Sequence, residues 1–341
     1  MNNEINSENI PLVSICMITY NQEPYISQAI DGVLMQKTNF PIELVIGEDC
    51  SKDNTRKICL EYKEKYPDQI KLLLPEKNLG MMPNAITTLQ TCTGKYIAMC
   101  EGDDYWTDPY KLQKQVDFLE ENEDFSICFH AVKIKKEREN KIVDDFITPE
   151  VSDATDIYRL SHGNYIHTPS VLFRRNEEVF TSIAEFGSLI VGDYVLHMLN
   201  ARYGKIKKLP ETMAIYRAEI GDWSSKDSSH RLPHWLNMLE QLLVLFADDE
   251  KVTAILKHQY SVYLFTLYNI YKKEKDICKA KTLFMTTCAN YPDLIYDEFN
   301  ARDNEWYYLK KKKIYRVGIL LLNPMSVLKK FKKMFKNGIH S

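Results

Sequence analysis

The sequence lacks several patterns that define common protein classes. It has only 12 glycines in 341 residues, and none belongs to a glycine-rich loop of the Walker or dinucleotide-binding type. No apolar run approaches the roughly 20 residues needed to cross a bilayer. The polar, acidic start of the chain is not expected to be a signal peptide. These absences argue against P-loop enzymes, dinucleotide-binding enzymes and membrane-spanning proteins.

The eight cysteines lack the spacing of a zinc site or of a redox pair. No C-x-x-C pair is present, and several cysteines lie within apolar runs, where a thiol behaves as a small hydrophobic side chain. We therefore expect eight free thiols and a cytoplasmic protein.

Strong net charge is also absent, at −3, but the charge is unevenly distributed. From Ala301 onward, eleven Lys or Arg stand against two acidic residues, so this tail carries +9 and the first 300 residues carry −12. The acidic body argues against a nucleic-acid partner. The tail combines lysine clusters and short apolar runs over residues 310–336. It is compatible with a peripheral anchor on an anionic membrane or with a solvated or docked helix.

Short apolar strands alternate with helices in the first 130 residues. Strands are expected at 13–19, 42–47, 70–74, 96–100 and 125–133, and helices at 27–35, 55–66, 83–91 and 111–122. This pattern predicts an α/β fold with a mostly parallel sheet flanked by helices. Ligands of such sheets bind at the carboxyl ends of the strands.

The pattern changes in the rest of the chain. Residues 137–149 are charged and are expected to form a loop, whereas strands at 170–174 and 212–216 flank a helix at 193–203. Three amphipathic helices are expected at 235–246, 252–272 and 277–290. The sequence thus predicts an N-terminal extension (1–10), an α/β domain (11–228), a helical region (229–300) and a basic amphipathic tail (301–341).

Carboxylates gather after two of the expected strands. Glu101, Asp103 and Asp104 follow the strand at 96–100, and Glu48 and Asp49 follow the strand at 42–47. Carboxylates packed this closely repel one another unless a cation lies among them, and Mg²⁺ and Mn²⁺ prefer oxygen ligands. The two clusters therefore predict a site for a metal-bound, phosphorylated ligand.

The order of these motifs resembles that of a family 2 glycosyltransferase with the GT-A nucleotide-sugar-binding fold. The matching pieces are V-S-I-C-M-I-T-Y-N at 13–21, E-D-x-S-x-D-N-T at 48–55, N-L-G at 78–80 followed by Asn84, G-K-Y-I at 94–97 and E-G-D-D at 101–104. The resemblance covers roughly residues 11–225. The form E-G-D-D-Y-W is similar to that of bacterial enzymes that assemble surface glycans.

The resemblance implies binding roles for several residues. Tyr20 would stack on the nucleotide base, and Asp49 would bond the imide N–H of the base, a pairing suited to uracil. Asp103 would contact the ribose, and Asp104 would ligate the Mn²⁺ or Mg²⁺ that bridges the diphosphate. Asn84 would also belong to the nucleotide-sugar site.

The resemblance extends to the second half of the α/β domain. Asp193, at the start of the helix at 193–203, would deprotonate the acceptor hydroxyl. Arg217 and Ser224 would be candidates for the diphosphate. Glu219 stands where relatives often have His, so no ligand role is carried over to it.

The implied activity is inverting, metal-dependent transfer of a sugar from a nucleoside-diphosphate sugar, with UDP favoured. The acceptor would be a hydroxyl of a glycan or lipid-linked glycan, reached in the cytoplasm or at the cytoplasmic face of the inner membrane. A catalytically inactive nucleotide-binding scaffold and a nucleotidyltransferase remain as alternatives. Asp193 is also compatible with the general preference for acids in a first helical turn, and Tyr20 with a core position.

Overall fold

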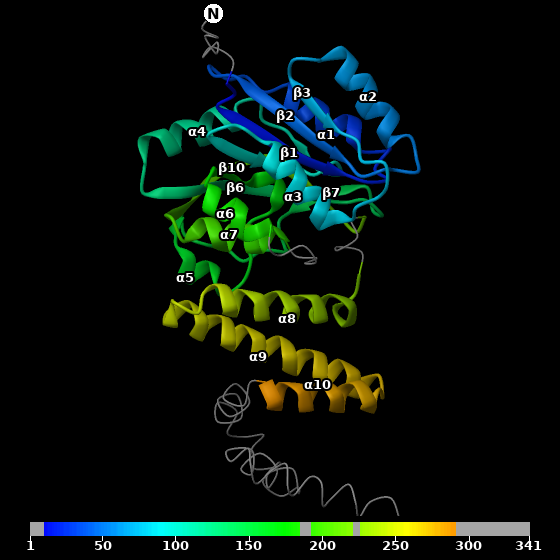
Figure 1. Cartoon of the computed structure of the whole chain (residues 1–341), viewed down its shortest axis with the longest axis vertical. Helices are drawn as coiled ribbons and strands as arrows, with labels where there is room; N and C mark the ends of the chain where they lie inside the picture. Colours follow the sequence, from blue (N-terminus) through cyan, green and yellow to red (C-terminus); the bar gives the residue numbers. More distant parts are fainter. Residues whose placement is uncertain (1–9, 185–191, 221–225, 291–341) are drawn as a thin grey trace, which may run out of the picture. The chain divides into compact units, whose positions relative to one another are not determined.

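The computed structural model describes residues 10–184, 192–220 and 226–290. It divides into two compact units, residues 1–227 and 228–341 (Figure 1). The basic tail at 301–341, nine residues of the expected N-terminal extension and Ser224 lie outside the described residues.

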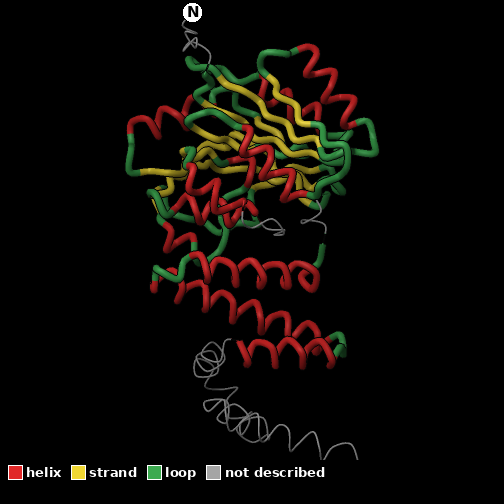
Figure 2. The backbone as a smooth tube through the Cα atoms, viewed as in Figure 1, coloured by secondary structure: helices red, strands yellow, loops and turns green. Residues whose placement is uncertain are grey.

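One ten-stranded sheet forms the framework of the first unit (Figure 2). Eight strands follow the order β3-β2-β1-β4-β9-β6-β10-β5, and off this path β7 pairs with β6 and β8 with β10. The first half of the sheet is parallel: β1 pairs with β2 and β4, and β2 pairs with β3. The strands are β1 (Val13–Thr19), β2 (Ile42–Glu48), β3 (Ile70–Leu73) and β4 (Tyr96–Met99), and the helices between them are α1 (Ile26–Leu34), α2 (Thr55–Lys65) and α3 (Met81–Thr91). These bounds agree with the expected ranges to within two residues.

The second half of the sheet is mixed rather than parallel. β9 is antiparallel to both β4 and β6, whereas β10 is parallel to β6. Its strands are β5 (Tyr105–Trp106), β6 (Phe125–Lys136), β7 (Lys141–Asp144), β8 (Ala154–Thr155), β9 (Leu172–Arg174) and β10 (Lys205–Ala218). The accompanying helices are α4 (Lys111–Glu121), α5 (Ile157–Leu160), α6 (Glu177–Ala184), α7 (Gly192–Ala201) and the short 3₁₀ helix η2 (Thr168–Ser170).

The expectation of a loop throughout residues 137–149 is wrong. β6 continues to Lys136, and β7 returns antiparallel to it as a hairpin, with Ile134 opposite Val143. Ile134 is fully buried, which draws the charged end of β6 into the sheet although its neighbours are lysines. A tight hairpin of this kind needs no crossover helix, so β7 can pair antiparallel to β6 through a short turn.

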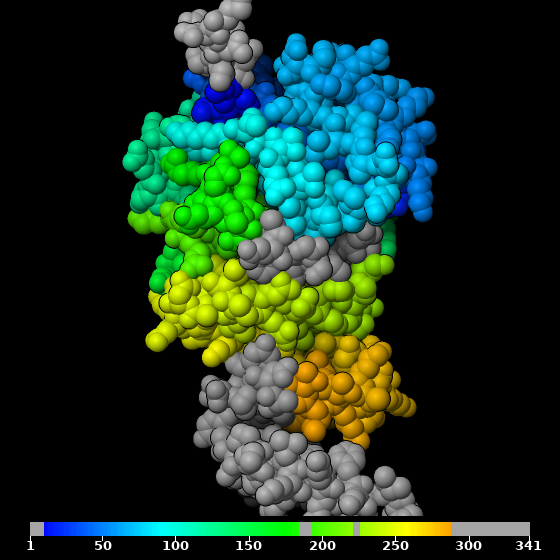
Figure 3. Space-filling model, in the orientation of Figure 1, coloured from blue at the N-terminus to red at the C-terminus, as the bar shows by residue number. Residues whose placement is uncertain are grey.

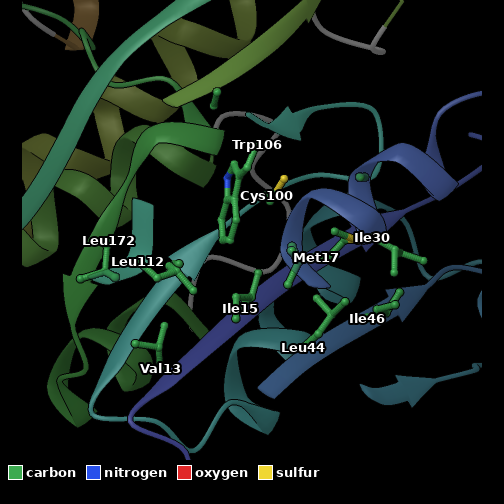
Figure 4. Packing of buried hydrophobic residues seen from close by; sticks show 14 of the residues in the cluster. Val13, Ile15, Met17, Ile30, Leu44, Ile46, Cys100, Trp106, Leu112 and Leu172 are labelled. Atoms are coloured by element: carbon green, nitrogen blue, oxygen red, sulfur yellow. The ribbon is translucent and has the colours of Figure 1, made fainter. Parts of the chain in front are cut away.

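The core of the first unit is built around β1. Val13, Ile15 and Met17 are fully buried and belong to the same cluster as Leu44 and Ile46 of β2 (Figure 4). Their spacing of two residues places them on one face of the sheet. α3 packs against β1 and β2, and α4 against β6. The edge formed by the strand ends is therefore supported by a close-packed layer beneath it.

In the described part of the second unit, residues 228–290, three helices are present, as the hydrophobic periodicity predicts. They are α8 (Ser228–Leu245), α9 (Glu250–Lys273) and α10 (Ile277–Asn290), and α9 packs against the other two. The Asp249 side chain caps α9 by accepting hydrogen bonds from the N–H groups of Lys251 and Val252. Across the first pair of helices, the Tyr260 hydroxyl donates to Glu240 (2.8 Å).

Two expectations concern membrane-spanning segments and the pairing of cysteines. Among the described helices, none is both long enough and apolar enough to cross a membrane. Within the described ranges, seven cysteines are free thiols, and five of these are buried.

Candidate active site

The loops that follow β2 and β4 are both joined to the end of β1. The N–H of Asp49 donates to the carbonyl of Thr19 (3.0 Å), and the N–H of Gly102 donates to that of Ile18 (3.0 Å). A Cβ atom at Gly102 would lie 2.5 Å from the Gln22 side-chain oxygen and 2.7 Å from the Thr19 hydroxyl. Glycine in the E-G-D-D motif is therefore a packing requirement at this edge of the sheet.

Hydrogen bonds also join the loop after β1 to the loop after β2. Asn21, with a φ of 51°, donates from its N–H to the Ser51 hydroxyl (2.9 Å) and accepts from the Lys52 N–H (2.8 Å). The N–H of Gln22 donates to the Thr55 hydroxyl (2.8 Å) at the start of α2. The two loops thus hold each other in one arrangement. Tyr20, which lies between β1 and Asn21, is partly buried at this edge of the sheet.

Asp49 shapes the loop that leads into α3. Its Oδ1 accepts from the N–H of Leu79 (2.7 Å), and its Oδ2 accepts from the N–H of Gly80 and the amide of Asn78 (both 2.9 Å). Each carboxylate oxygen can accept two hydrogen bonds, so Oδ1 retains capacity for one more donor. The predicted bond from Asp49 to a nucleotide base is compatible with this geometry and stays a prediction.

Asn84 lies on α3, where it contacts the backbone of β2. It is 3% exposed, and its Nδ2 donates to the carbonyl of Gly47 (2.8 Å). A Cβ at Gly47 would lie 2.6 Å from Asn84 Oδ1, so glycine is what allows this close packing. In the described part of the chain the amide nitrogen of Asn84 is directed at β2 rather than at the acidic residues. Its role in sugar binding stays a prediction.

Three carboxylates after β4 form a compact cluster, which we call the acid cluster: Glu101, Asp103 and Asp104. One oxygen of each lies within 4.8 Å of the others. Asp104 Oδ1 accepts from the N–H of Arg217 (2.7 Å), whereas Oδ2 is buried and has no hydrogen-bond partner among the described residues. A buried carboxylate oxygen without a donor is costly unless a cation compensates it. The donor set, its spacing and this free oxygen therefore fit a hard divalent cation.

The electrostatics of the acid cluster agree with this interpretation. Burial, followed by the charges of Asp103 and Asp193, raises the pKa of Glu101 to about 8. Burial, followed by Asp103 and Glu101, raises the pKa of Asp104 well above its usual range. For Asp104, desolvation and like charges outweigh the hydrogen bond and the charge of Arg217, which lower the pKa. Perturbed carboxylates of this kind are typical of functional sites.

Arg217, on β10, ties that strand to the acid cluster. Its guanidinium donates to the carbonyl of Asp103, to the side chain of Gln28 and to Glu137 (2.8 Å from Nε). The guanidinium lies between two aromatic rings, 4.8 Å from the centroid of Tyr25 and 4.6 Å from that of Tyr105. Arg217 is only 4% exposed, and its hydrogen bonds to Asp103 and Asp104 hold these two residues of the acid cluster in place. Its predicted contact with a diphosphate stays a prediction.

Asp193 lies in the first turn of α7 and approaches the acid cluster from the other half of the sheet. It is close enough to raise the pKa of Glu101, and burial raises its own pKa. The Asn164 amide donates to Asp193 Oδ2 (3.1 Å). α6 contacts both α7 and α3, and Figure 3 shows the green atoms of this part of the chain beside the cyan atoms of the α3 region. The structure thus brings Asp193 near Glu101 of the acid cluster.

Some residues near the site have no role predicted from the sequence. Burial raises the pKa of the Tyr216 phenol, and the charges of Asp104, Glu101, Asp103 and Asp193 raise it further, so Tyr216 lies within their electrostatic reach. Glu137, the partner of Arg217, lies in the segment expected to be a loop. Glu219 adopts a φ of 76°, and its Oε2 is buried without a hydrogen-bond partner in the described ranges. These residues are brought to the site by contacts between segments far apart in the chain. Local sequence patterns therefore do not reveal their positions.

Comparison with known proteins agrees with this geometry. The chain is 40% identical over 222 residues to an uncharacterized protein of Mycobacterium tuberculosis, Rv1520, covering 64% of this chain and 62% of the relative. It thus spans about three-fifths of the length of that relative. It is 36% identical over 139 residues, 41% of this chain and 52% of the relative, to the Escherichia coli protein UDP-Glc:alpha-D-GlcNAc-diphosphoundecaprenol beta-1,3-glucosyltransferase WfgD.

A solved structure has the same fold. Staphylococcus aureus TarS 1–349 in complex with UDP-GlcNAc superposes with a TM-score of 0.60 and 17% identity, covering 83% of this chain and 81% of that one. The sheet with its flanking helices thus has the GT-A nucleotide-sugar-binding fold. Residues 14–180 match the family model described as glycosyl transferase family 2, so the chain carries a domain of that family.

Proposed function

We propose that the protein is an inverting, divalent-metal-dependent glycosyltransferase. It would move a sugar from a nucleoside-diphosphate sugar, UDP being favoured, to a hydroxyl of a glycan or lipid-linked glycan in surface-polysaccharide assembly. The observation that carries this proposal is the acid cluster with the free Asp104 Oδ2, facing Asp193. The names of WfgD and of TarS with UDP-GlcNAc support a UDP-linked donor.

The residues of the acid cluster would hold the metal, with Asp104 Oδ2 as the free ligand atom. When bound, Mn²⁺ or Mg²⁺ would supply Lewis-acid stabilisation of the charge that develops on the departing diphosphate. Tyr20 would stack on the base, and Asp49 would accept its imide N–H. Asp103 would orient the ribose, and Arg217 and Asn84 would complete the donor site.

Asp193 would act as the base. As the acceptor oxygen bonds to the anomeric carbon, its proton passes to an Asp193 carboxylate oxygen. The bond from the anomeric carbon to the diphosphate oxygen breaks, and its electron pair leaves with the nucleoside diphosphate. Attack from the face opposite the leaving group inverts the configuration and requires no covalent intermediate. Such a transfer of the acceptor proton to a positioned carboxylate contributes about 10²–10⁴-fold in rate.

Calorimetric titration with UDP, GDP and dTDP, in Mn²⁺ and in EDTA, tests the donor site. We expect one nucleotide to bind in Mn²⁺ only, and Asp104→Ala to abolish that binding. Asp144→Ala is a matched control, because Asp144 is 95% exposed at its side chain on β7. No metal-dependent binding of any nucleotide would refute the proposal. Binding without turnover of any UDP-sugar would favour the inactive scaffold.

The place of action follows from the same proposal. A lipid-linked acceptor would be reached at the cytoplasmic face of the inner membrane, with residues 310–336 as a peripheral contact. These residues lie outside the described ranges, so the proposal rests on their sequence alone. Pelleting with anionic liposomes, compared between the full chain and a chain ending at residue 300, tests it: equal pelleting would exclude the anchor.

A further inference from the structure

Residues 164–170, which we call the bridge segment, connect Asp193 to the acid motif. At one end, Asn164 Oδ1 accepts from the N–H of Ile166 (3.1 Å), and Asn164 Nδ2 donates to Asp193 Oδ2 (3.1 Å). The first bond fixes which end of the amide is the acceptor, so the NH₂ group is the part directed at the carboxylate. Asn164 is therefore oriented before any ligand arrives.

The other end of the bridge segment is joined to the acid motif itself. The indole N–H of Trp106 donates to the carbonyl of Pro169 (2.8 Å). Trp106 is 2% exposed and lies two residues after Asp104. The carbonyl of His167 accepts from both the N–H (2.9 Å) and the hydroxyl (2.7 Å) of Ser170, which closes the turn. This end is thus fixed relative to the carboxylates that would hold the metal.

The middle of the bridge segment is held by His167. Its Nε2 lies 3.0 Å from Asp145 Oδ2, and its ring centroid is 4.9 Å from that of Tyr216. Asp145 is itself held in a turn, because it accepts from the N–H of Ile147 (2.8 Å). Sequence analysis alone would treat His167 as a packing residue. In the structure, His167 links the loop after β7, through Asp145, to the ring of Tyr216.

We propose that the bridge segment is a positioning device for Asp193, with Asn164 as the residue that orients the carboxylate. The inference rests on the proposed function, in which Asp193 accepts the proton of the acceptor. Like charge from the acid cluster pushes the Asp193 carboxylate away from the position where it is needed. The Asn164 donor opposes that displacement, and Trp106 and His167 keep the donor in place. A displacement of about 1 Å at such a group can cost about a hundredfold in rate.

Turnover of donor by the full chain tests this role. The probes are UDP-GlcNAc and UDP-Glc with Mn²⁺ and no added acceptor, with UDP release as the readout. We expect Asn164→Ala to lower kcat about tenfold to a hundredfold, the range for a lost hydrogen bond to a charged group, with KM for the donor changed less than twofold. Asn200→Ala is the control, since Asn200 is buried two turns further along α7 and donates to the carbonyl of Leu196 (2.8 Å).

A second variant separates positioning from simple structural support. Asn164→Asp keeps the shape of the side chain but replaces the donor with a carboxylate. We expect a larger loss of kcat at pH 8 than at pH 6, because at lower pH one carboxyl of the pair carries a proton and can donate it. A variant that only weakened the fold would lose activity at both pH values alike. Asn164→Ala within twofold of the wild-type kcat would overturn the proposal.

A measurement without substrate keeps the inference independent of the donor. Carboxyl ¹³C NMR of aspartate-labelled protein, with the Asp193 signal assigned through Asp193→Asn, follows the ionisation of that group. Glu101, His167 and Tyr216 are the titratable groups that face it. We expect Asn164→Ala to raise the pKa of Asp193 and Asn200→Ala to leave it unchanged; no shift in Asn164→Ala would overturn the positioning role. Failure of the protein to bind any nucleotide would refute the proposed function. The titration of Asp193 would still test the positioning role of Asn164, because it requires no nucleotide.

Discussion

The acid cluster should make the metal-free protein less stable as the pH rises. Glu101 has a usual pKa of 4.5 and reaches about 8 in the fold. The folded state therefore binds the proton more tightly than the unfolded state, and the contribution of Glu101 to stability is greatest below pH 4.5 and is lost as the pH rises to about 8. The full shift corresponds to about 5 kcal/mol, and solvent screening at this partly buried group reduces the expected loss to about 2–3 kcal/mol.

A bound divalent cation should reverse that loss. At a hundredfold excess of Mn²⁺ over its dissociation constant, binding to the folded state adds about 2.7 kcal/mol. For a unit of this size that amounts to about 5–10 °C in Tm. The gain should be present at pH 8 and small at pH 5, where protons occupy the carboxylates.

Thermal unfolding followed by circular dichroism, at pH 5 and pH 8 with and without Mn²⁺, measures both effects. Asp104→Asn is the matched variant, because its side-chain oxygen can still accept from the N–H of Arg217 while one charge is removed. We expect this variant to be more stable than wild type in EDTA at pH 8 and to gain nothing from Mn²⁺. Equal Tm of the metal-free wild type at both pH values, or an equal Mn²⁺ shift in the variant, would refute the reasoning.

Three further substitutions test the framework of the site. Gly102→Ala should lower the free energy of unfolding by about 1–3 kcal/mol in urea denaturation, because its Cβ would lie 2.7 Å from the Thr19 hydroxyl. Arg56→Met should cost about 3 kcal/mol in the same assay, since it leaves the fully buried Glu48 without its ion pair; an unchanged midpoint would contradict this. Arg217→Lys should weaken UDP–Mn²⁺ binding about tenfold by calorimetry, because Lys cannot make the forked bonds that fix the acid cluster.

The parallel half of the fold could be predicted from the sequence because local signals agree there. Apolar runs of four to seven residues, helix starts and strand-end acids all occur in the order that a parallel sheet requires. β10 was less visible, since Lys205, Lys207 and Lys208 interrupt its apolar residues. Its pairing with β6 outweighs their low strand propensity. The sequence therefore indicated only residues 212–216 of a strand that spans Lys205–Ala218.

The site divides in the same way. Asp103 and Asp104 could be predicted to lie near Asp49 because consecutive parallel strands end at one edge. That Asp193 approaches Glu101, however, depends on the packing of α7, which no local pattern encodes. Asn164, His167 and Glu137 act through partners 29, 22 and 80 positions away in the chain. Their roles become visible only once those partners are in place.

The antiparallel strand β9 joins two half-sheets that differ in construction, and this has an evolutionary consequence. The residues proposed to hold the donor come mainly from β1, β2 and β4, whereas the proposed base comes from α7, beyond β9. Duplicated genes of this architecture can accumulate changes beyond β9 and acquire new acceptors while retaining an inherited donor. In domain-exchange experiments, however, a crossover around residues 161–171 should fail, because it would separate β6 from its partner β10 and interrupt the bridge segment.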